Sequence, residues 1–595
     1  MSTRRTRCQF GLAAAVTGVL MVAPAVVQGQ GPDGLLRGTV ISDGRPVEGV
    51  VVSANIGAEP ITTSVYTGAD GQYVFPPMTR GTYTVWAQAI GLVRAQASVD
   101  LGSGVRRVDF TMDPTDDIIP QLSGYQVMAA LPEDTVAHRR GKALFQSNCT
   151  YCHETSTALR DRFDRHGWET IVGVMMNGFS PSNRTPLEPW QEALAAYLTE
   201  MRGPGPSPMQ PRVFRPTGVA TLPVVYEYDV EYNGGGYSAH NGSDWRFGAA
   251  SSAGGTAGMH DAALDREGNI WLTSTRRSQT RTVARVDGKT GKTTEYAVML
   301  ENGEAARSHG MLPGSDGKIY FNASPRIPYL DGTLGIIHPE TRAVESVPAP
   351  AGVGGWLGED ANGFIWTQSG TMSDGGAVRF DPRTRTFDVY ESPTGSLTYG
   401  VAGDAHGNGW WMAVNDDIIV HADTSTGTVS EIQLPDRPLT EYLKPGDFAA
   451  GEEVPRRGLG GKQSPRRPVA DLHGNALWVP NFYGNTLLRI DTRTQELTYY
   501  AVPYPAMNPY EAMVDSQHGV WVTFQNSDEV GRFDPDTESW TVYSYPTKGM
   551  AQRQNHLFER DGVVQLVSAS GPSTRVGRMV IRSAEEVQAL RDRAQ

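Results

Sequence analysis

The chain has 595 residues, a formal net charge of −13 and a sequence pI near 5.5. This acidic balance argues against nucleic acid as a partner, because phosphate contacts need clustered lysine and arginine. The length exceeds one ordinary hydrophobic core, so several domains are expected, and 67 glycines with 39 prolines indicate many short strands joined by tight turns.

Residues 1–29 have the pattern of a secretory signal peptide. Three arginines within the first seven residues precede an apolar run from Phe10 to Val27, and small residues around Ala23 to Gly29 suit a signal peptidase. An uncleaved N-terminal anchor is the alternative. No later segment is long and apolar enough to cross a bilayer, so we expect a periplasmic or secreted protein that does not span the membrane after signal removal.

Residues 34–112 show the alternation of short β-strands. The stretches GTVISDGRPVEGVVVSA, TGADGQYVFPPMTRGTYTV and VDFTM resemble a carboxypeptidase regulatory-like domain, which implies a transthyretin-like β-sandwich. No histidine and glutamate zinc-ligand set accompanies the pattern, so we expect no peptidase chemistry. We therefore expect this domain to act as a docking surface or a spacer. The alternative is that it binds a sugar or a peptide. Residues 113–130 look like a linker.

The strongest chemical motif is Cys149, Cys152 and His153, which is the C-x-x-C-H signature of c-type haem attachment. Two thiols at this spacing can each bond one haem vinyl group, and the adjacent imidazole can reach the iron. A zinc site would need four ligands, and no second cysteine pair or close cysteine and histidine cluster is present. A thioredoxin-type pair would follow a buried strand, whereas residues 133–146 look helical. A plain disulfide or a chance match remains the alternative.

The flanks of the motif are two helical stretches. Gly141 and Phe145 share one helical face before the motif, and LEPWQEALAAYLTEM at 187–201 has helical apolar spacing after it. Together these features resemble a small all-α single-haem cytochrome c domain over residues 131–202. The resemblance implies a covalent haem c with Cys149 and Cys152 as thioethers and His153 as axial iron ligand.

That family also has a second axial ligand, usually a methionine. Met175 is preferred here, because its spacing from Trp168 is similar to that of cytochrome modules fused to periplasmic dehydrogenases. Met176, His166 or no protein side chain remain open, and two adjacent methionines can also simply fill a core. A His/Met pair would suit electron transfer, whereas an open position would suit small-ligand binding.

A repeat follows the Pro/Gly-rich linker at 203–218 and covers residues 219–582. Its marker glycines recur every 43 to 49 residues, apart from one step of 67 that indicates an insertion near 435–467; they are Gly268, Gly317, Gly363, Gly407, Gly474, Gly519 and Gly562. Such a period with several short strands per unit predicts a seven-bladed β-propeller. The strand 224–230 resembles the outer strands, so we expect it to complete the last blade and leave no bare sheet edge. Residues 583–595 are expected to be a C-terminal tail.

The repeat units DREGNIWLTS…VARVDGKTG and DSQHGVWVTFQNSDEVGRFDPDT resemble the streptogramin (virginiamycin B) lyase-like propeller family. That family works with a histidine base and a carboxylate-bound magnesium ion. Its full catalytic motif does not align residue by residue here, so lyase activity is not carried over. A divalent metal ion in the propeller is an expectation without assigned ligands.

The repeat itself predicts a ring of residues at one mouth of the channel. The positions eight residues before each marker glycine are His260, His309, Gly355, Tyr399, Arg466, Glu511 and Gln554, with Trp356, Tyr510 and His556 close by. These residues are polar and varied, as expected when each blade contributes something different to one ligand. Solvated loops around a water-filled channel are the alternative. The candidate catalytic residues are His260, His309, Tyr399, Glu511 and His556.

Three functions are compatible with these features. The first is an exported electron-transfer protein with one haem c, whose propeller binds a small molecule, a glycan or a partner, and which exchanges electrons with a redox partner protein or dehydrogenase. The second is a lyase or other small-molecule enzyme at the propeller mouth, with the haem accessory. The third is a non-catalytic haem-containing sensor scaffold.

Overall fold

The computed structural model describes residues 33–57, 59–150, 153–177, 190–231, 242–247, 258–325, 332–350, 352–369, 375–395, 397–437, 442–449, 452, 462–570 and 574–595, without the side chains of Met176 and Asn177. The predicted signal peptide at 1–29 and Cys152 lie outside these residues. Within them, no helix is both long and apolar enough to cross a membrane.

The N-terminal domain is a β-sandwich of two sheets. One sheet joins β1 (Leu35–Ser42), β2 (Arg45–Pro46), β5 (Gln72–Val74), β8 (Val105–Arg107) and β9 (Phe110–Thr111). The other contains β4 (Ile61–Tyr66), β3 (Val51–Ile56), β6 (Gly81–Gln88) and β7 (Ala95–Leu101), all antiparallel. Alternating inward residues such as Val40, Val52 and Val85 fill the space between the sheets.

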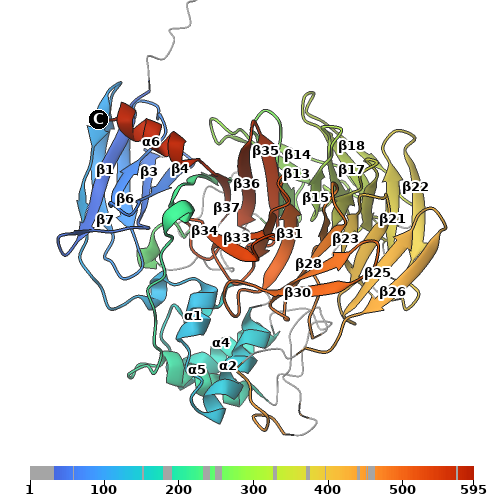
Figure 1. Cartoon of the computed structure of the whole chain (residues 1–595), viewed down its shortest axis with the longest axis horizontal. Helices are drawn as coiled ribbons and strands as arrows, with labels where there is room; N and C mark the ends of the chain where they lie inside the picture. Colours follow the sequence, from blue (N-terminus) through green and yellow to red (C-terminus); the bar gives the residue numbers. More distant parts are fainter. Residues whose placement is uncertain are drawn as a thin grey trace, which may run out of the picture.

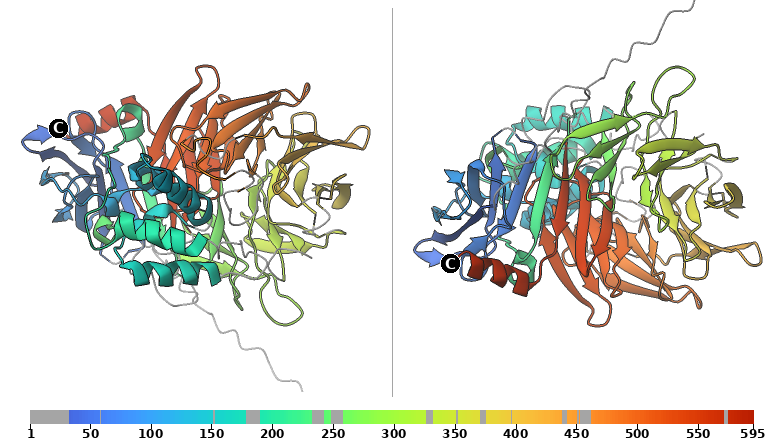
Figure 2. Two further views of the ribbon diagram at one scale, coloured as in Figure 1. Left: turned by 90° about the horizontal axis from the view of Figure 1, so that it is seen from below. Right: turned by 90° about the horizontal axis from the view of Figure 1, so that it is seen from above.

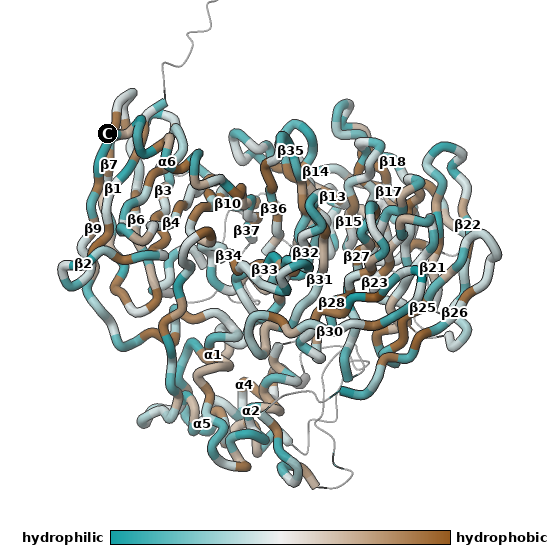
Figure 3. Tube along the Cα trace, in the orientation of Figure 1, coloured by the Kyte–Doolittle hydropathy of each residue, from teal (hydrophilic) through white to brown (hydrophobic). Residues whose placement is uncertain are grey.

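Six four-stranded antiparallel blades follow, each built from consecutive strands. Blades 1 to 3 are β11 (Met259–Leu264), β12 (Ile270–Ser274), β13 (Val283–Val286), β14 (Thr293–Tyr296); β15 (Met311–Pro313), β16 (Ile319–Ala323), β17 (Thr333–His338), β18 (Ala343–Val347); β19 (Leu357–Glu359), β20 (Ile365–Gln368), β21 (Gly376–Asp381), β22 (Thr386–Glu391). Blades 4 to 6 are β23 (Thr398–Gly403), β24 (Gly409–Ala413), β25 (Ile418–Asp423), β26 (Thr428–Gln433); β27 (Val469–Ala470), β28 (Ala476–Asn481), β29 (Thr486–Asp491), β30 (Leu497–Ala501); β31 (Pro509–Val514), β32 (Val520–Phe524), β33 (Glu529–Asp534), β34 (Ser539–Ser544). The second strands are buried, apart from Gln368 at the end of β20, whereas the fourth strands are half exposed. In Figure 3 the turns at the rims of the blades are mostly hydrophilic.

The seventh blade confirms the predicted closure. It consists of β35 (Asn555–Arg560), β36 (Val563–Ser570) and β37 (Arg575–Val580), and its outer strand is β10 (Val224–Asp229) from before the first blade. The other edge of β10 pairs with β4 of the sandwich. The two domains therefore share one eight-stranded sheet, from β35 to β7, and Figure 1 shows the sandwich beside the seventh blade.

A repeated side-chain contact sets the register of the blades. An aspartate before the turn accepts a hydrogen bond from the indole Nε1 of the tryptophan six residues later, in the pairs Asp265–Trp271, Asp360–Trp366, Asp404–Trp410 and Asp515–Trp521. Gly268 takes a φ of +88° three residues after Asp265, and in blade 6 His518 takes the same place with a φ of +63°. Gly519 is thus one residue out of step, so Tyr510 rather than Glu511 occupies the position equivalent to His260.

A helical domain lies below one face of the propeller (Figures 1 and 2). Its elements are η1 (Ile119–Gln121), α1 (Gly124–Ala130), α2 (Val136–Cys149), α3 (Thr155–Leu159), α4 (Arg165–Asn177) and α5 (Gln191–Arg202). The segment 113–130, predicted as a linker, therefore contains η1 and α1. Helices α2 and α5 cross closely, since a Cβ atom on Gly141 would lie 2.3 Å from Cδ2 of Tyr197.

Two remaining segments attach to the sandwich and the propeller. The short η4 (Gly218–Thr221) and η5 (Trp245–Phe247) lie between them, where Trp245 donates from Nε1 to the carbonyl of Pro546. The terminal residues, predicted as a tail, form α6 (Ala584–Arg593), which begins with a capping box at Ser583 and packs on the sandwich through an apolar contact with Leu35.

Arg575 on β37 links the seventh blade to β10 and to strand β4 of the sandwich. Its guanidinium is 2% exposed, binds Glu227 and Asp229 on β10, and donates to Thr62 on β4. Both domains therefore depend on one buried charge network.

We expect Arg575→Met to lower the free energy of unfolding by about 3–5 kcal/mol, because it leaves buried carboxylates without their partner. Arg383→Met is the matched control: its guanidinium lies 3.2 Å from Asp381 at the surface and should contribute less than about 1 kcal/mol. Chemical denaturation followed by tryptophan fluorescence measures both. Equal effects of the two substitutions would contradict the proposed role of Arg575.

Candidate functional site

The predicted ring residues lie at the starts of the innermost strands, at one mouth of the channel. Strands β11, β23 and β31 each carry a register shift at this point, around His260, Tyr399 and Tyr510 respectively. Such bulges re-aim side chains, and they are common beside functional sites. The residues that meet here come from different blades around the channel.

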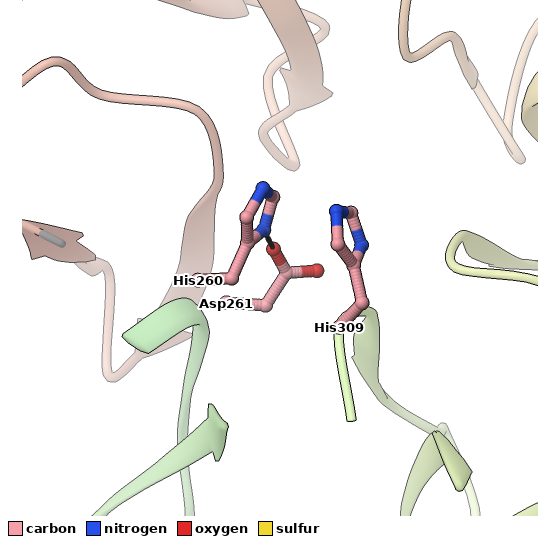
Figure 4. Close-up of side chains that lie close together, drawn as sticks. All are labelled: His260, Asp261 and His309. Carbon is pink, nitrogen blue, oxygen red and sulfur yellow. Dashed lines mark hydrogen bonds and ion pairs between the residues drawn. The ribbon is translucent and has the colours of Figure 1, made fainter. Parts of the chain in front are cut away.

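His260, Asp261 and His309 form the centre of the site (Figure 4). The imidazole rings of His260 and His309 lie side by side with centroids 3.7 Å apart, and Nδ1 of His260 is 2.5 Å from Oδ1 of Asp261. The other carboxylate oxygen of Asp261 accepts from the backbone N–H of Met311 at 3.2 Å. Asp261 is fully buried, and its contacts with His260 and Met311 hold its carboxylate in place.

The hydrogen-bond partners define the tautomers of both histidines. Nδ1 of His309 lies 3.0 Å from the carbonyl oxygen of Gly355, which can only accept, so this nitrogen carries the hydrogen. Nδ1 of His260 likewise faces a carboxylate. Burial and neighbouring charge hold the pKa of each histidine well below its ordinary value; for His260 the charges are those of Arg467 and Arg553. Both rings are therefore neutral, with a basic Nε2.

Arg467 spans the channel mouth. Its side chain is 1% exposed and starts before β27 in blade 5, and its Nη1 lies 3.3 Å from Oδ1 of Asp261 in blade 1. Its Cζ lies 4.2 Å from the ring centroid of Trp356 and 5.2 Å from that of Tyr510. The guanidinium thus contacts blades 1, 3 and 6 at once and stays charged, because nearby carboxylate and phenol groups raise its pKa despite burial.

Tyr399 and Tyr510 form a second pair, with their hydroxyl groups in direct contact. The guanidinium of Arg466 stacks over both rings and over Phe482, at 4.7, 5.5 and 4.5 Å. Burial alone would raise the pKa of Tyr399, but Arg466 and Arg467 hold it below its ordinary value. Tyr510 has its pKa raised by burial.

The other predicted residues have different surroundings. Glu511 is buried and accepts from the backbone N–H of Asn555 at 2.7 Å, and burial raises its pKa well above the ordinary value. Gln554 bridges Ala262 and Met311 through backbone hydrogen bonds, so it links blades. His556 accepts from the backbone N–H of Leu264, further along β11, and is not part of the histidine pair.

Sequence reasoning missed Asp261, Arg467 and Arg553 as site residues. The first two directly follow predicted ring positions, and bulges or irregular strand starts bring both side chains of such a pair into the mouth. Arg553, whose Nη1 lies 3.4 Å from Nε2 of His260, precedes the ring position of blade 7. Including the neighbours of each ring position would have found all three.

The His260, Asp261 and His309 donor atoms lie within 4.8 Å of one another, a spacing that could hold a metal ion. However, Asp261 already pairs with Arg467, and Arg553 faces Nε2 of His260. Two guanidinium groups at these distances oppose a further cation. The geometry suits an acid–base site better than a metal centre.

The predicted haem-attachment motif begins where α2 ends, at Cys149. His153 is 9% exposed, and its Nδ1 lies 3.0 Å from the carbonyl oxygen of Glu154. This contact leaves Nε2 as the basic nitrogen, which is the tautomer that an iron ligand needs. Met175 lies on α4 and is 41% exposed. His153 therefore fits the part of an iron ligand, whereas covalent haem attachment and the assignment of Met175 stay predictions.

The segment around this motif is fixed to the propeller mouth by hydrogen bonds. The pairs are Ser147 with Tyr483, Thr150 with Gln525, Thr155 with Asn526, and Glu154 with the backbone N–H of Ala551. These partners lie in the β28–β29, β32–β33 and β34–β35 connections. In an antiparallel meander these connections share one end with the starts of the innermost strands, so the motif and the histidine pair are at the same mouth.

Two short paths join the motif to the site. Arg553, which faces His260, is two residues from Ala551, which binds Glu154 next to His153. The second path runs through aromatic rings from Tyr483 to Phe482 and on to Tyr510, with centroid distances of 4.9 and 5.9 Å.

Comparison with known proteins identifies one domain by its family model and finds solved structures that resemble part of the chain. The family model of the carboxypeptidase regulatory-like domain matches residues 36–113, so this prediction is confirmed. No curated protein matches the chain. Similar solved structures are virginiamycin B lyase from Staphylococcus aureus (18% identity, TM-score 0.41, 54% of this chain and 94% of that one), a streptogramin B lyase (20%, 0.41, 54% and 93%) and a nidogen/laminin complex (12%, 0.31, 47% and 96%). Likeness at this level carries no inference about activity.

The neutral histidine pair predicts sensitivity to acid. Because the folded pKa values of His260 and His309 lie well below about 6.5, the unfolded chain binds more protons than the folded one below that pH, and stability falls as pH falls. Thermal melting between about pH 7.5 and about pH 5 measures this slope. The slope should be smaller in a His260→Gln/His309→Gln variant, and an unchanged slope would show that the two rings are not held neutral.

Proposed function

We propose that the chain is an exported c-type haem protein, in which the helical domain carries one covalent haem and the propeller mouth binds the molecule that exchanges electrons with it. One observation carries the proposal: the segment with the haem-attachment motif is hydrogen-bonded to the same mouth that gathers His260, His309 and Arg467. A redox partner protein or dehydrogenase would complete the exchange.

The chain's own residues have distinct parts in this function. Cys149 and Cys152 would form the thioethers, His153 would bind the iron, and Met175 is the preferred second ligand. The haem, when bound, would supply one-electron redox chemistry. The crossing of Gly141 and Tyr197 fixes α2 against α5 and so positions the start of the motif.

At the mouth, the acid–base groups are already arranged for a bound molecule. His309 has its Nδ1–H held by the carbonyl of Gly355, so its Nε2 can accept a proton. Asp261 orients His260 in the same way, and Arg467 fixes Asp261. An oxidation that releases protons would use such a neutral base beside an electron acceptor.

A second candidate is a lyase or other acid–base enzyme at the same mouth, with the haem accessory. The neutral histidine pair favours it, because elimination needs a base but no electron acceptor. The two candidates differ in one respect: a lyase would keep its activity in a chain that cannot bind haem.

The haem assignment is tested by export of the full chain in a host with working haem-attachment machinery. We expect a mass increase of one haem and a c-type pyridine haemochrome spectrum, both lost in Cys149→Ser/Cys152→Ser and kept in the control Val136→Ala at the exposed start of α2. Loss of the methionine-dependent red absorption band in Met175→Ala, but not in Met176→Ala, would assign the second ligand. The bare polypeptide mass in the exported wild-type chain would refute the proposal.

A further inference from the structure

A cavity of about 490 Å³ lies where the sandwich, helix α1, the segment 203–218 and blade 6 meet. Three of its lining residues are buried and polar, and they are here called its floor: Glu529, Tyr545 and Lys548. Val213 and Val219 also line the cavity and are exposed, so the cavity opens to solvent. Cavities of this volume hold small organic ligands. The residues of the propeller mouth do not line this cavity.

The floor has hydrogen-bonding capacity that the described residues do not use. Tyr545 is 1% exposed, and its hydroxyl group makes no hydrogen bond among these residues. The carboxyl group of Glu529 accepts from two hydroxyl groups at the long distances of 3.2 and 3.3 Å. Nζ of Lys548 lies 3.5 Å from Oδ2 of Asp528. Buried polar groups are costly without good partners, so this floor favours a ligand that supplies them.

The walls of the cavity are aromatic. The rings of Tyr125 and Tyr504 are stacked with their centroids 5.0 Å apart, and Phe214 meets both of them edge to face at 5.8 Å. Trp245 and Trp540 line the cavity as well. The face of an aromatic ring carries partial negative charge and attracts C–H groups. Such walls suit a ligand with C–H faces, which a sugar ring has.

The charges at the floor oppose a charged ligand. Asp528 and Glu529 would repel an anion, and the ammonium group of Lys548 already faces Asp528. A cation would be repelled by Lys548, whose Nζ lies 4.6 Å from the ring centroid of Trp245 and so takes the aromatic face that a cation would use. Burial raises the pKa of Glu529 to about 7, so this carboxyl group is only partly ionised at neutral pH. The floor therefore suits a neutral ligand.

Hydroxyl groups fit all three residues of the floor. A hydroxyl group can donate to Glu529, accept from Lys548, and do either with Tyr545. A phenol offers one such group, whereas a sugar ring carries several around its edge and keeps its C–H faces for the walls.

We propose that this cavity binds a neutral saccharide, whose hydroxyl groups meet Glu529, Tyr545 and Lys548 and whose ring packs on the aromatic walls. The inference goes beyond the proposed function, because the cavity is separate from the propeller mouth and the binding needs no haem.

The test is titration of the full chain with three neutral disaccharides, cellobiose, maltose and diacetylchitobiose. Calorimetry measures the binding, and so does tryptophan fluorescence, since Trp245 and Trp540 line the cavity. Choline, acetate and phenol are the cationic, anionic and aromatic controls. We expect saturable binding of at least one disaccharide, and each control should bind at least about tenfold more weakly, because it forms fewer hydrogen bonds with the floor.

Tyr545→Phe removes only the hydroxyl group that has no partner among the described residues. It should weaken disaccharide binding about threefold to tenfold, which is the effect of one hydrogen bond, and should not lower the Tm. The matched control is Tyr543→Phe, two residues earlier in the chain and not at the cavity, which should bind the disaccharide as the wild type does.

Glu529→Gln should weaken the same binding at least about tenfold, because hydrogen bonds to a charged group are stronger. Its control is Glu538→Gln, an exposed glutamate in the turn between β33 and β34, and thermal melting shows that both variants fold. No binding of any of the three disaccharides would show a cavity filled only by water and would overturn the proposal. Tighter binding of choline, acetate or phenol, or equal effects of Tyr545→Phe and Tyr543→Phe, would also overturn it.

Discussion

The buried guanidinium of Arg467 is the contact on which the propeller mouth depends. It reaches from blade 5 to Asp261 in blade 1 and stacks on Trp356 and Tyr510 on the way. A charge in this position costs a large desolvation free energy unless its partners are fixed. Asp261 is held in turn by His260 and by the backbone N–H of Met311. The same contacts therefore pair the charge of Arg467, set the tautomer of His260 and fix the position of its ring. A site made this way is preorganised before any ligand arrives.

The rest of the chain holds this mouth against the helical domain. Strand β10 is shared between the seventh blade and the sandwich, and Arg575 connects the two through buried carboxylates. Trp168 of α4 and Trp521 of blade 6 belong to one continuous apolar core, so the helices do not form a separate globule. The sandwich, the helices and the propeller therefore form one structural unit, in which the predicted haem-attachment motif lies at the same mouth as the histidine pair.

Sequence periodicity predicted much of this arrangement. Regular glycine spacing gave seven blades, and the likeness of Val224–Val230 to outer strands gave the closure by β10. The periodicity could not predict that β10 also pairs with β4. Nothing in the sequence of an edge strand identifies the strand that will pair with it. The repeat also predicted the wrong ring residue in blade 6, Glu511 in place of Tyr510. The reason is that His518 takes the left-handed turn position that glycine holds elsewhere.

The side chains of the site were only half predictable. His260, His309 and Tyr399 followed from the repeat, whereas Asp261 and Arg467 depend on bulges and on a contact between residues 206 positions apart. Such contacts arise from ring closure and leave no local pattern. The same holds for the packing of Glu154 on Ala551, which places the motif at the mouth.

The central claim is the proposal that a haem on the helical domain is electrically coupled to the propeller mouth, and the reduction potential of that haem tests it most directly. The guanidinium of Arg553 contacts His260, and Arg553 is two residues from Ala551, which binds Glu154 next to His153. A positive charge near the proposed haem would stabilise the reduced iron. Redox titration of the purified holoprotein should show a lower potential in Arg553→Gln than in the wild type. The control Arg560→Gln, which changes an exposed arginine at the end of β35, should leave the potential unchanged. An identical potential in all three proteins would contradict the coupling.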